Sequence, residues 1–491
     1  MRATARKYCR SSQVNGVAIF VSHQEFCSKM NSSCSQFDDD LLLCQRPNSR
    51  SLRSGCTALR RAVRPFMCRV SVHRCTDNLR LAISLGGEVM RKSIVLSTAM
   101  ALAAGTAAYA AEISDGKVKI GILNDQSGVY ANFGGKYSYE AAKMAVEDFG
   151  GKVLGAPVEV VTADHQNKAD VASNIARQWY DTEQVDSIME LTSSSVGLAV
   201  QALSKDKKKI TVNTGAATTE LTGKQCSPYG FHWAYDTYSL AVGTGGALVK
   251  QGGDSWFFLT ADYAFGYSLE ENTSNFVEAN GGKVLGSVRH PLATTDYSSF
   301  LLQAQSSGAK VIGLANAGLD TSNAIKQAAE FGIVAGGQRL AALLFTLAEV
   351  HGLGLEAAQG LTLTEGFYWD RDDESRKFGE RFKERTGAMP NMVHTGTYSA
   401  VLHYLKAIEK AGTDDADAVA KAMKEMPVND VFAKDGHVAA NGRMIHDMYL
   451  IEVKKPDESK QPWDYYKVLA TIPGKEAFMD PAKSGCPLVT Q

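Results

Sequence analysis

The sequence predicts an α/β protein of two lobes, each a doubly wound parallel sheet. Short apolar runs typical of buried strands alternate with helical patterns over residues 117–364, and this alternation indicates parallel sheets with right-handed crossovers. The series divides into two halves, residues 117–234 and 235–364, each long enough for one lobe. A chain of 491 residues also exceeds what one hydrophobic core usually organises.

The first 89 residues differ in composition from the rest of the chain. They carry 14 Lys and Arg against 6 Asp and Glu, whereas residues 111–491 carry 36 against 47. Seven of the nine cysteines also lie there, without the paired CxxC spacing of a zinc site. We interpret residues 1–89 as a mis-assigned, disordered upstream extension of the reading frame. The alternative is a genuine basic extension, whose Arg and Ser content also suits disorder.

A second candidate start of the protein lies at Met90. Arg91 and Lys92 form a positive segment, residues 94–104 are apolar, and residues 108–110 read Ala-Tyr-Ala, a small-x-small cleavage site. Residues 90–110 therefore predict a secretory signal peptide, with an uncleaved membrane anchor as the alternative. We expect the protein to start at Met90 and to be exported to the periplasm.

The stretch 117–151 predicts the first strand, a ligand-binding edge and the first helix. Residues 118–123 form an apolar strand pattern, and a polar loop follows at 124–128. Tyr130 and Phe133 come next, before an Ala-rich helical pattern. Because open α/β sheets bind ligands at the carboxyl ends of their strands, we expect this loop to lie at a ligand site.

The later elements follow in order. Strands are predicted at 158–162, 187–191, 210–213, 255–259, 283–289, 311–315 and 340–345. Helices are predicted at 169–182, 196–204, 239–250, 267–279, 297–306 and 322–331, and then at 374–385, 393–411 and 416–426. A strand-rich tail is predicted at 431–438, 444–453 and 463–469. This order suggests a first lobe of residues 117–234 plus 366–428, a second of 235–365 plus 429–491, and a hinge where the chain crosses between them.

Two cysteines, Cys226 and Cys486, remain in the exported part. Each is next to a proline and to serine or glycine, which indicates surface loops. Because two lone cysteines in an oxidising compartment are usually paired, we predict a disulfide that ties the C-terminal tail to the first lobe. The alternative is two separate buried thiols.

Six blocks of sequence carry a family resemblance. They read VKIGILNDQSGVYANFG, LTSSSVGLAV, VNTGAATTELTG, FLTADYAFGYS, TTDYSSFLLQAQSSGAKVIGLANAG and MPNMVHTGTYSAVLHYLKAIEKAG. In this order they resemble the periplasmic leucine/isoleucine/valine-binding family of ABC-importer receptors over nearly all of residues 117–455. The resemblance implies a type I periplasmic binding protein fold, with two lobes on a three-segment hinge that close around a small solute and deliver it to a membrane permease.

Hydroxyl-bearing and small residues follow two of the predicted strands. Residues 192–195 lie where a strand ends and a helix begins, so their hydroxyls and free N–H groups meet the positive end of the helix dipole and suit a carboxylate. N-capping by one serine is the alternative. Residues 214–218 repeat the arrangement on the next strand. The resemblance implies that a ligand carboxylate is held here, and the candidates are Ser193, Ser194, Ser195, Ala216, Ala217 and Thr218.

The specificity positions depart from the family pattern. Its amino-acid binders surround the ligand with aromatic residues and pair its ammonium with an acid in the second lobe. The resemblance places Phe133, Phe265 and Ala317 at aromatic positions, and Thr346 in the stretch where the acid is expected. A buried ammonium without a counter-charge costs on the order of several kcal/mol, so an α-amino acid would need another partner. The candidate carboxylates are Asp236, Asp262, Asp320 and Glu365.

The alternative is a pocket for a bulkier or aromatic carboxylate that has no amino group. Four more aromatic residues fall near the lobe edges, where each could be a ligand wall or hinge packing: Tyr130, Tyr235, Tyr263 and Trp369.

Enzyme and nucleic-acid functions are not favoured. The sequence has no P-loop, GxSxG or HExxH motif, and its mildly acidic exported part has no basic aromatic stripe. The sequence predicts the monomeric receptor of a branched-chain-amino-acid-type ABC importer, binding a small carboxylate or amino acid without cofactor or metal and partnered by ABC permease subunits. The alternative is a sensor of the same fold that controls a regulator or a membrane kinase; an exported hydrolase lacks a nucleophile and base.

Overall fold

A computed structural model describes residues 12–14, 17–19 and 113–489. The predicted signal peptide and all but six residues of the predicted upstream extension lie outside the described residues. Within that extension β1 (Ser12–Val14) and β2 (Val17–Ile19) pair antiparallel. The account below concerns residues 113–489.

The first sheet has six strands in the order β4-β5-β3-β6-β7-β8, and all are parallel except β4 at its edge. The strands are β3 (Val118–Asn124), β4 (Lys152–Val153), β5 (Ala156–Asp164), β6 (Ser187–Glu190), β7 (Ile210–Asn213) and β8 (Gly230–His232). The helices between them are α4 (Gly135–Phe149), α5 (Ala169–Asp181), α6 (Ser194–Lys207) and the short η2 (Thr219–Leu221).

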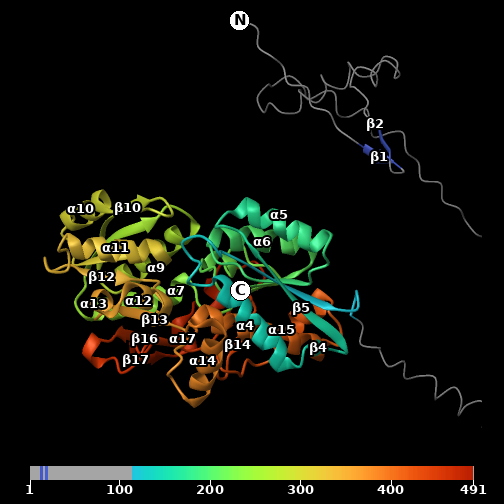
Figure 1. Cartoon of the computed structure of the whole chain (residues 1–491). Coiled ribbons are helices and arrows are strands. Elements are labelled where there is room, and N and C mark those ends of the chain that lie inside the picture. Colours follow the sequence, from blue (N-terminus) through green and yellow to red (C-terminus); the bar gives the residue numbers. More distant parts are fainter. Residues whose placement is uncertain (1–11, 15–16, 20–112, 490–491) are drawn as a thin grey trace, which may run out of the picture. The chain divides into compact units, whose positions relative to one another are not determined.

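Helices cover both faces of this sheet. Ile120 and Ile122 on β3 pack into the same core as α4, whereas the neighbouring Leu123 packs with α5 and α6. Successive side chains of a strand point to opposite faces, so a strand covered on both sides is apolar almost throughout. Figure 1 shows α5 and α6 together on this half of the molecule.

The second sheet has four parallel strands in the order β10-β9-β11-β12. They are β9 (Ser255–Ala261), β10 (Lys283–His290), β11 (Val311–Ala315) and β12 (Arg339–Ala342). The associated helices are α7 (Thr237–Leu240), α8 (Gly246–Lys250), α9 (Ala264–Ala279), α10 (Ser298–Ser306), α11 (Gly318–Glu330), α12 (Leu347–Leu353) and α13 (Leu355–Ala358). Each lobe is therefore built on a mainly parallel sheet with helices between its strands, as the sequence predicted.

The predicted helix at 239–250 is interrupted. A π-helical segment, η3 (Ala241–Gly245), separates α7 from α8. It passes so close to β13 (Thr362–Glu365) that a Cβ on Gly243 would lie 2.2 Å from Thr364 Oγ1. Glycine permits this approach but weakens a regular helix, which local periodicity does not reveal.

The C-terminal part holds three long helices and two small antiparallel sheets. The helices are α14 (Asp373–Thr386), α15 (Met392–Ala411) and α16 (Ala416–Glu425), and α15 packs against α4. One sheet is β13-β16-β17, with β16 (Met448–Val453) and β17 (Tyr466–Ile472); the other is β14 (His437–Val438) with β15 (Met444–Ile445). Short segments η4 (Pro456–Glu458), α17 (Gly474–Ala477) and η5 (Pro481–Lys483) complete the tail.

The strand predicted at 431–438 is wrong over most of its length. Only His437 and Val438 pair in a sheet. Upstream, Asp430 accepts hydrogen bonds from the backbone N–H groups of Phe432 and Ala433, at 2.8 and 3.2 Å, which bends the chain into a turn. An aspartate that bonds its own backbone in this way competes with strand formation.

Three segments of the chain meet where the hinge between the lobes is expected: a first crossing at residues 233–235, a second at Gly366, and a third that contains the buried Arg443. Arg443 is 2% exposed, and its guanidinium donates to the carbonyls of Tyr235 at 2.8 Å and Trp233 at 2.6 Å. A Cβ on Gly366, in the second crossing, would lie 3.1 Å from the carbonyl of Ala234. These contacts form the three-segment hinge, and burial lowers the pKa of Arg443 to about 10.

The C-terminal tail is joined to the first half of the chain by a disulfide between Cys226 and Cys486. The cysteine Cα atoms lie 5.7 Å apart, and both residues are buried. Both cysteines lie on loops with exposed neighbours, as predicted, and the tail packs on the first loop, where a Cβ on Gly223 would lie 3.1 Å from the Ser484 carbonyl.

Candidate functional site

Six strand ends from the two parallel sheets converge on one cavity. Its lining residues follow β3, β6 and β7 of the first sheet and β9, β11 and β12 of the second, with one more residue in the first crossing segment. They are Tyr130, Phe133, Thr192, Ser193, Ser194, Gly215, Ala217, Tyr235, Tyr263, Phe265, Ala317 and Leu344. This is the edge at which parallel α/β sheets bind ligands.

The side of the cavity that follows β6 and β7 consists of Thr192, Ser193, Ser194, Gly215 and Ala217, and we call it the polar wall. Ser194 Oγ accepts hydrogen bonds from the N–H groups of Ala217 at 3.3 Å and Thr218 at 3.1 Å, which ties the two strand ends together. Ser193 is the N-cap of α6, but its side chain makes no capping bond. The positive end of α6 therefore faces the cavity with its donors available.

Ser193 carries the clearest sign of a missing partner. Its side chain is 4% exposed, and its Oγ makes no hydrogen bond within the described residues, although the Tyr263 hydroxyl faces it. The Ser193 hydroxyl therefore has hydrogen-bonding capacity that a ligand in the cavity can use.

The backbone that leads from β6 into the polar wall is strained. Glu190, Leu191 and Ser193 have φ angles of +79°, +58° and +89°, although none is glycine. Non-glycine residues in this left-handed region are uncommon and each costs on the order of 1–3 kcal/mol. Such strain persists where the surroundings hold it, and it clusters at binding sites.

The side of the cavity from the second sheet consists of Tyr263, Phe265, Ala317 and Leu344, and we call it the apolar wall. Tyr263 and Ala317 are the N-caps of α9 and α11, with ordinary extended φ angles of −160° and −154°. The rings of Tyr263 and Phe265 lie 5.9 Å apart between centroids. This wall offers shape and aromatic surface rather than charge.

The two lobes touch each other around the cavity. The hydroxyls of Tyr130 and Tyr263 lie 2.6 Å apart, and the N–H of Leu319 donates to the carbonyl of Val129 at 3.1 Å. Phe133 packs edge-on against Tyr235, with ring centroids 6.1 Å apart. The structure is thus a closed form that buries the lining residues.

The structure places the predicted site residues in two groups. Seven line the cavity: Phe133, Ser193, Ser194, Ala217, Tyr263, Phe265 and Ala317. Five do not: Ser195, Ala216, Thr218, Asp236 and Thr346. Ser195 lies half-buried further along α6, and Thr218 Oγ1 instead caps η2 by accepting from Glu220 N at 3.3 Å.

The side chains of Asp236 and Thr346 form contacts outside the cavity. Asp236 caps α7 by accepting from Ser239 N at 2.8 Å, and its carboxylate lies 3.6 Å from Arg443 in the hinge. Thr346 caps α12, where its hydroxyl meets Glu349 at 2.5 Å. The other acids proposed for an ammonium, Asp262, Asp320 and Glu365, do not line the cavity either.

The sequence prediction missed Glu190, a carboxyl group directly behind the polar wall. It closes β6, is fully buried, and accepts from Thr192 N at 2.9 Å. Burial, together with the nearby Asp125, raises the pKa of Glu190 to about 8. An acidic residue at the end of an otherwise apolar strand, two positions before Thr192, was the available signal.

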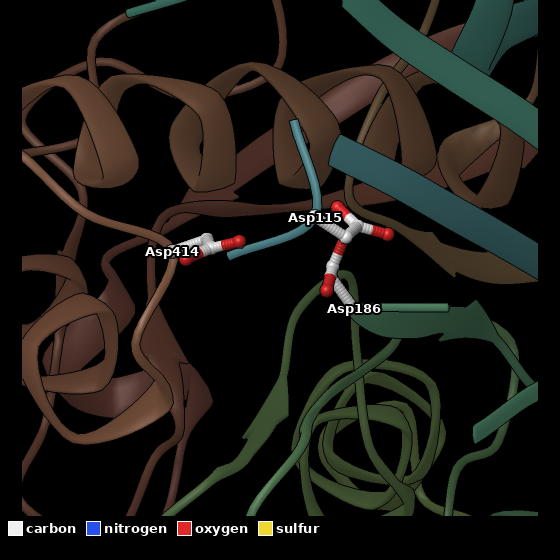
Figure 2. Close-up of side chains that lie close together, drawn as sticks. All are labelled: Asp115, Asp186 and Asp414. Atoms are coloured by element: carbon white, nitrogen blue, oxygen red, sulfur yellow. The ribbon is translucent and has the colours of Figure 1, made fainter. Parts of the chain in front are cut away.

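A cluster of three aspartates lies at the opposite edge of the first sheet, at the amino-terminal ends of its strands. Figure 2 shows Asp115, Asp186 and Asp414 converging from three segments of the chain. Asp186 accepts from Lys119 N at 2.9 Å and lies 3.2 Å from Lys209 Nζ, and Asp414 accepts from Ser114 N at 3.0 Å. These donors give the cluster a structural role in joining the segments.

Comparison with known sequences identifies the family. A sequence model of the periplasmic binding protein family matches residues 117–460. The chain belongs to this family. Its members bind solutes rather than catalyse reactions, which agrees with the sequence evidence against an enzyme. No helix within the described residues is long and apolar enough to cross a membrane.

Several relatives of this periplasmic binding protein are known. A periplasmic binding protein of Burkholderia mallei is 55% identical, with a TM-score of 0.75 over 76% of this chain and 99% of that one. A branched chain amino acid ABC transporter periplasmic ligand-binding protein of Burkholderia xenovorans LB400 is 40% identical, with a TM-score of 0.69 over 76% and 100%. Leu/Ile/Val-binding protein homolog 6 of Brucella abortus is 27% identical over 75% of this chain and 94% of its own.

One structure of the same fold contains an aromatic acid. The solute binding protein of an ABC transporter from Rhodopseudomonas palustris HaA2, in complex with p-hydroxybenzoic acid, is 26% identical, with a TM-score of 0.66 over 73% of this chain and 97% of that one.

Proposed function

We propose that this protein is the extracytoplasmic receptor of an ABC importer for a small aromatic or branched carboxylate. The observation that carries the proposal is the unpaired Ser193 hydroxyl, which lies at the positive end of α6 and faces a closed cavity lined with aromatic rings. Closure of the two lobes on the ligand provides the signal that a permease recognises.

The polar wall suits a carboxylate group. A carboxylate accepts hydrogen bonds only, and the wall offers the Ser193 hydroxyl together with the first-turn N–H groups of α6. Hydrogen bonds to a charged group contribute about 1.5–3 kcal/mol each, enough to orient a small ligand. No lining residue is charged, so the dipole and these donors would hold the anion.

The rest of the cavity suits an apolar body without an ammonium. Apart from the polar wall, the cavity is lined by aromatic rings and by the side chains of Ala317 and Leu344, which suit one ring or a short branched chain. An ammonium here would be desolvated without an anionic lining group. The p-hydroxybenzoic acid complex of a relative supports an aromatic acid without an ammonium.

Export to the periplasm through the signal peptide at Met90, and action as a monomer beside ABC permease subunits, complete the proposal. The Cys226–Cys486 disulfide supports an oxidising compartment.

A thermal-shift panel followed by calorimetry tests the proposal. We expect benzoate, p-hydroxybenzoate and 4-methylpentanoate to raise the melting temperature, because a ligand at 100 times its Kd stabilises the folded state by about 2.7 kcal/mol. The matched neutral amides should not do so. A rise with leucine or valine alone, or equal rises with acids and amides, would contradict the proposed carboxylate ligand.

Ser193→Ala and Ser195→Ala form a matched pair for the same experiment. Ser193→Ala removes the unpaired hydroxyl and should weaken carboxylate binding by about tenfold or more. Ser195 is on the same helix but does not line the cavity, so Ser195→Ala should bind within about twofold of the wild type.

A further inference from the structure

The carboxyl group of Glu190 lies behind the polar wall in a slot between two glycines. A Cβ on Gly134 would lie 2.0 Å from Glu190 Oε1, and one on Gly215 would lie 2.9 Å from the same atom. Gly215 and Thr192 both line the cavity, and Thr192 bonds to Glu190 through its backbone N–H and its hydroxyl. One side chain, Thr192, therefore separates this carboxyl group from the ligand space.

Within residues 113–489, the groups that face Glu190 do not include a compensating cation. Asp125 faces it from the loop after β3, His165 lies near Thr192 from the segment after β5, and Tyr235 faces it from the first crossing. From α15, His394 Nε2 lies 3.2 Å from the Gly134 carbonyl. Burial lowers the pKa of His165 to about 4 and that of His394 to about 3, so both are neutral near pH 7.

The nearby buried Asp125 has more hydrogen-bond donors than Glu190. It accepts hydrogen bonds from Gly128 N at 2.7 Å, Tyr130 N at 2.9 Å and Asn167 Nδ2 at 2.6 Å. The donors to Glu190 are the two groups of Thr192. A buried anion with so few donors is costly, whereas a protonated acid can itself donate a hydrogen bond.

We propose that Glu190 is a positioning residue that acts as a neutral carboxylic acid and turns the Thr192 hydroxyl toward the carboxylate of the ligand. In the acid form, the Glu190 O–H donates to Thr192 Oγ1, and the Thr192 proton is then free to donate into the cavity. In the ionised form, the Thr192 hydroxyl must donate to Glu190, and a second negative charge faces the ligand. Binding of an anion is thus linked to retention of one proton, an inference that rests on the proposed function.

The first test is the pH dependence of benzoate binding by calorimetry in the full protein. Affinity should be constant from about pH 6 to about pH 7 and then fall roughly tenfold by about pH 9, as Glu190 ionises. Glu190→Gln mimics the neutral acid, so it should bind benzoate within about threefold of the wild type at pH 7 and lose the decline. Glu349→Gln removes another buried acid, which does not contact Thr192, and should keep the decline.

The second test needs no ligand and separates this inference from the proposed function. An acid whose pKa is raised by folding stabilises the protein below its unfolded pKa and loses that contribution as the pH rises through the folded pKa. The melting temperature of the wild type should therefore fall relative to Glu190→Gln between about pH 5 and about pH 8. A constant difference would overturn the inference, as would a Glu190→Gln variant that keeps the alkaline loss of affinity. Absence of benzoate binding with the expected melting shift would count against the proposed ligand alone.

Discussion

The two walls of the cavity follow the strand ends of two similar parallel sheets, yet their chemistry and geometry differ. The polar wall holds hydroxyls and Ser193 with its positive φ, and two more positive-φ residues precede it, whereas the apolar wall begins its helices at Tyr263 and Ala317 with ordinary extended backbone. Strain is maintained where backbone donors must face a ligand. Under the proposed function, we expect the polar wall to orient the ligand and the apolar wall to select its shape.

The disulfide lies outside both walls of the cavity, and its removal should have the largest effect on stability. The crosslink joins residues 260 positions apart, so replacing Cys226 and Cys486 by alanine should lower the free energy of unfolding by about 4 kcal/mol. Urea denaturation measures this loss. A reductant should produce a similar loss in the wild type and no further loss in the double variant; a further loss there would contradict the explanation.

The polar wall should tolerate no added atom. A Cβ at residue 215 would lie 2.4 Å from Thr192 Oγ1, so Gly215→Ala should displace the wall and weaken benzoate binding by about 30-fold or more, or about 2–3 kcal/mol. Isothermal calorimetry measures the change. The control is Gly352→Ala in α12, where a Cβ meets no atom within 4 Å, and its affinity should not change. Equal affinities for the two variants would break the comparison of the walls.

The apolar wall should discriminate by size. Ala317→Leu adds three carbon atoms to a buried lining position and should weaken benzoate binding about tenfold, while the smaller propionate loses much less. Competition calorimetry gives the ratio of the two affinities. Leu319→Ala, at a 48% exposed position of the same helix, should leave the ratio unchanged. If Ala317→Leu weakens both acids equally, the wall does not select shape.

The hydrogen bond between Tyr130 and Tyr263 of the apolar wall should contribute least to ligand affinity. Tyr130→Phe or Tyr263→Phe removes the hydroxyl pair that joins the lobes and should cost about 1 kcal/mol, or about fivefold in affinity. Because either variant breaks the same hydrogen bond, the double variant should be no weaker than a single one. Additive losses in this cycle would show that the hydroxyls act separately.

Many elements were predictable because they depend on local pattern. The strands at 210–213 and 311–315 and the helix at 416–426 agree with β7, β11 and α16 within one residue. The interruption of the helix at η3 was not predictable, because the π-helical segment packs against Thr364, which is distant in the sequence. The expected boundaries of the two lobes remain a prediction.

The sequence by itself determined which strand ends carry hydroxyls and which carry aromatic rings, because periodicity and turn residues place strand ends without knowledge of the fold. Tertiary structure alone decided the role of each carboxyl group. The Asp236 carboxylate lies beside Arg443, and the Glu349 carboxyl group bonds to Thr346. The Glu190 carboxyl group lies between two glycines that are 81 residues apart in the chain. Whether a carboxyl group caps a helix, pairs with a cation or remains neutral depends on burial and on neighbours that sequence spacing does not reveal.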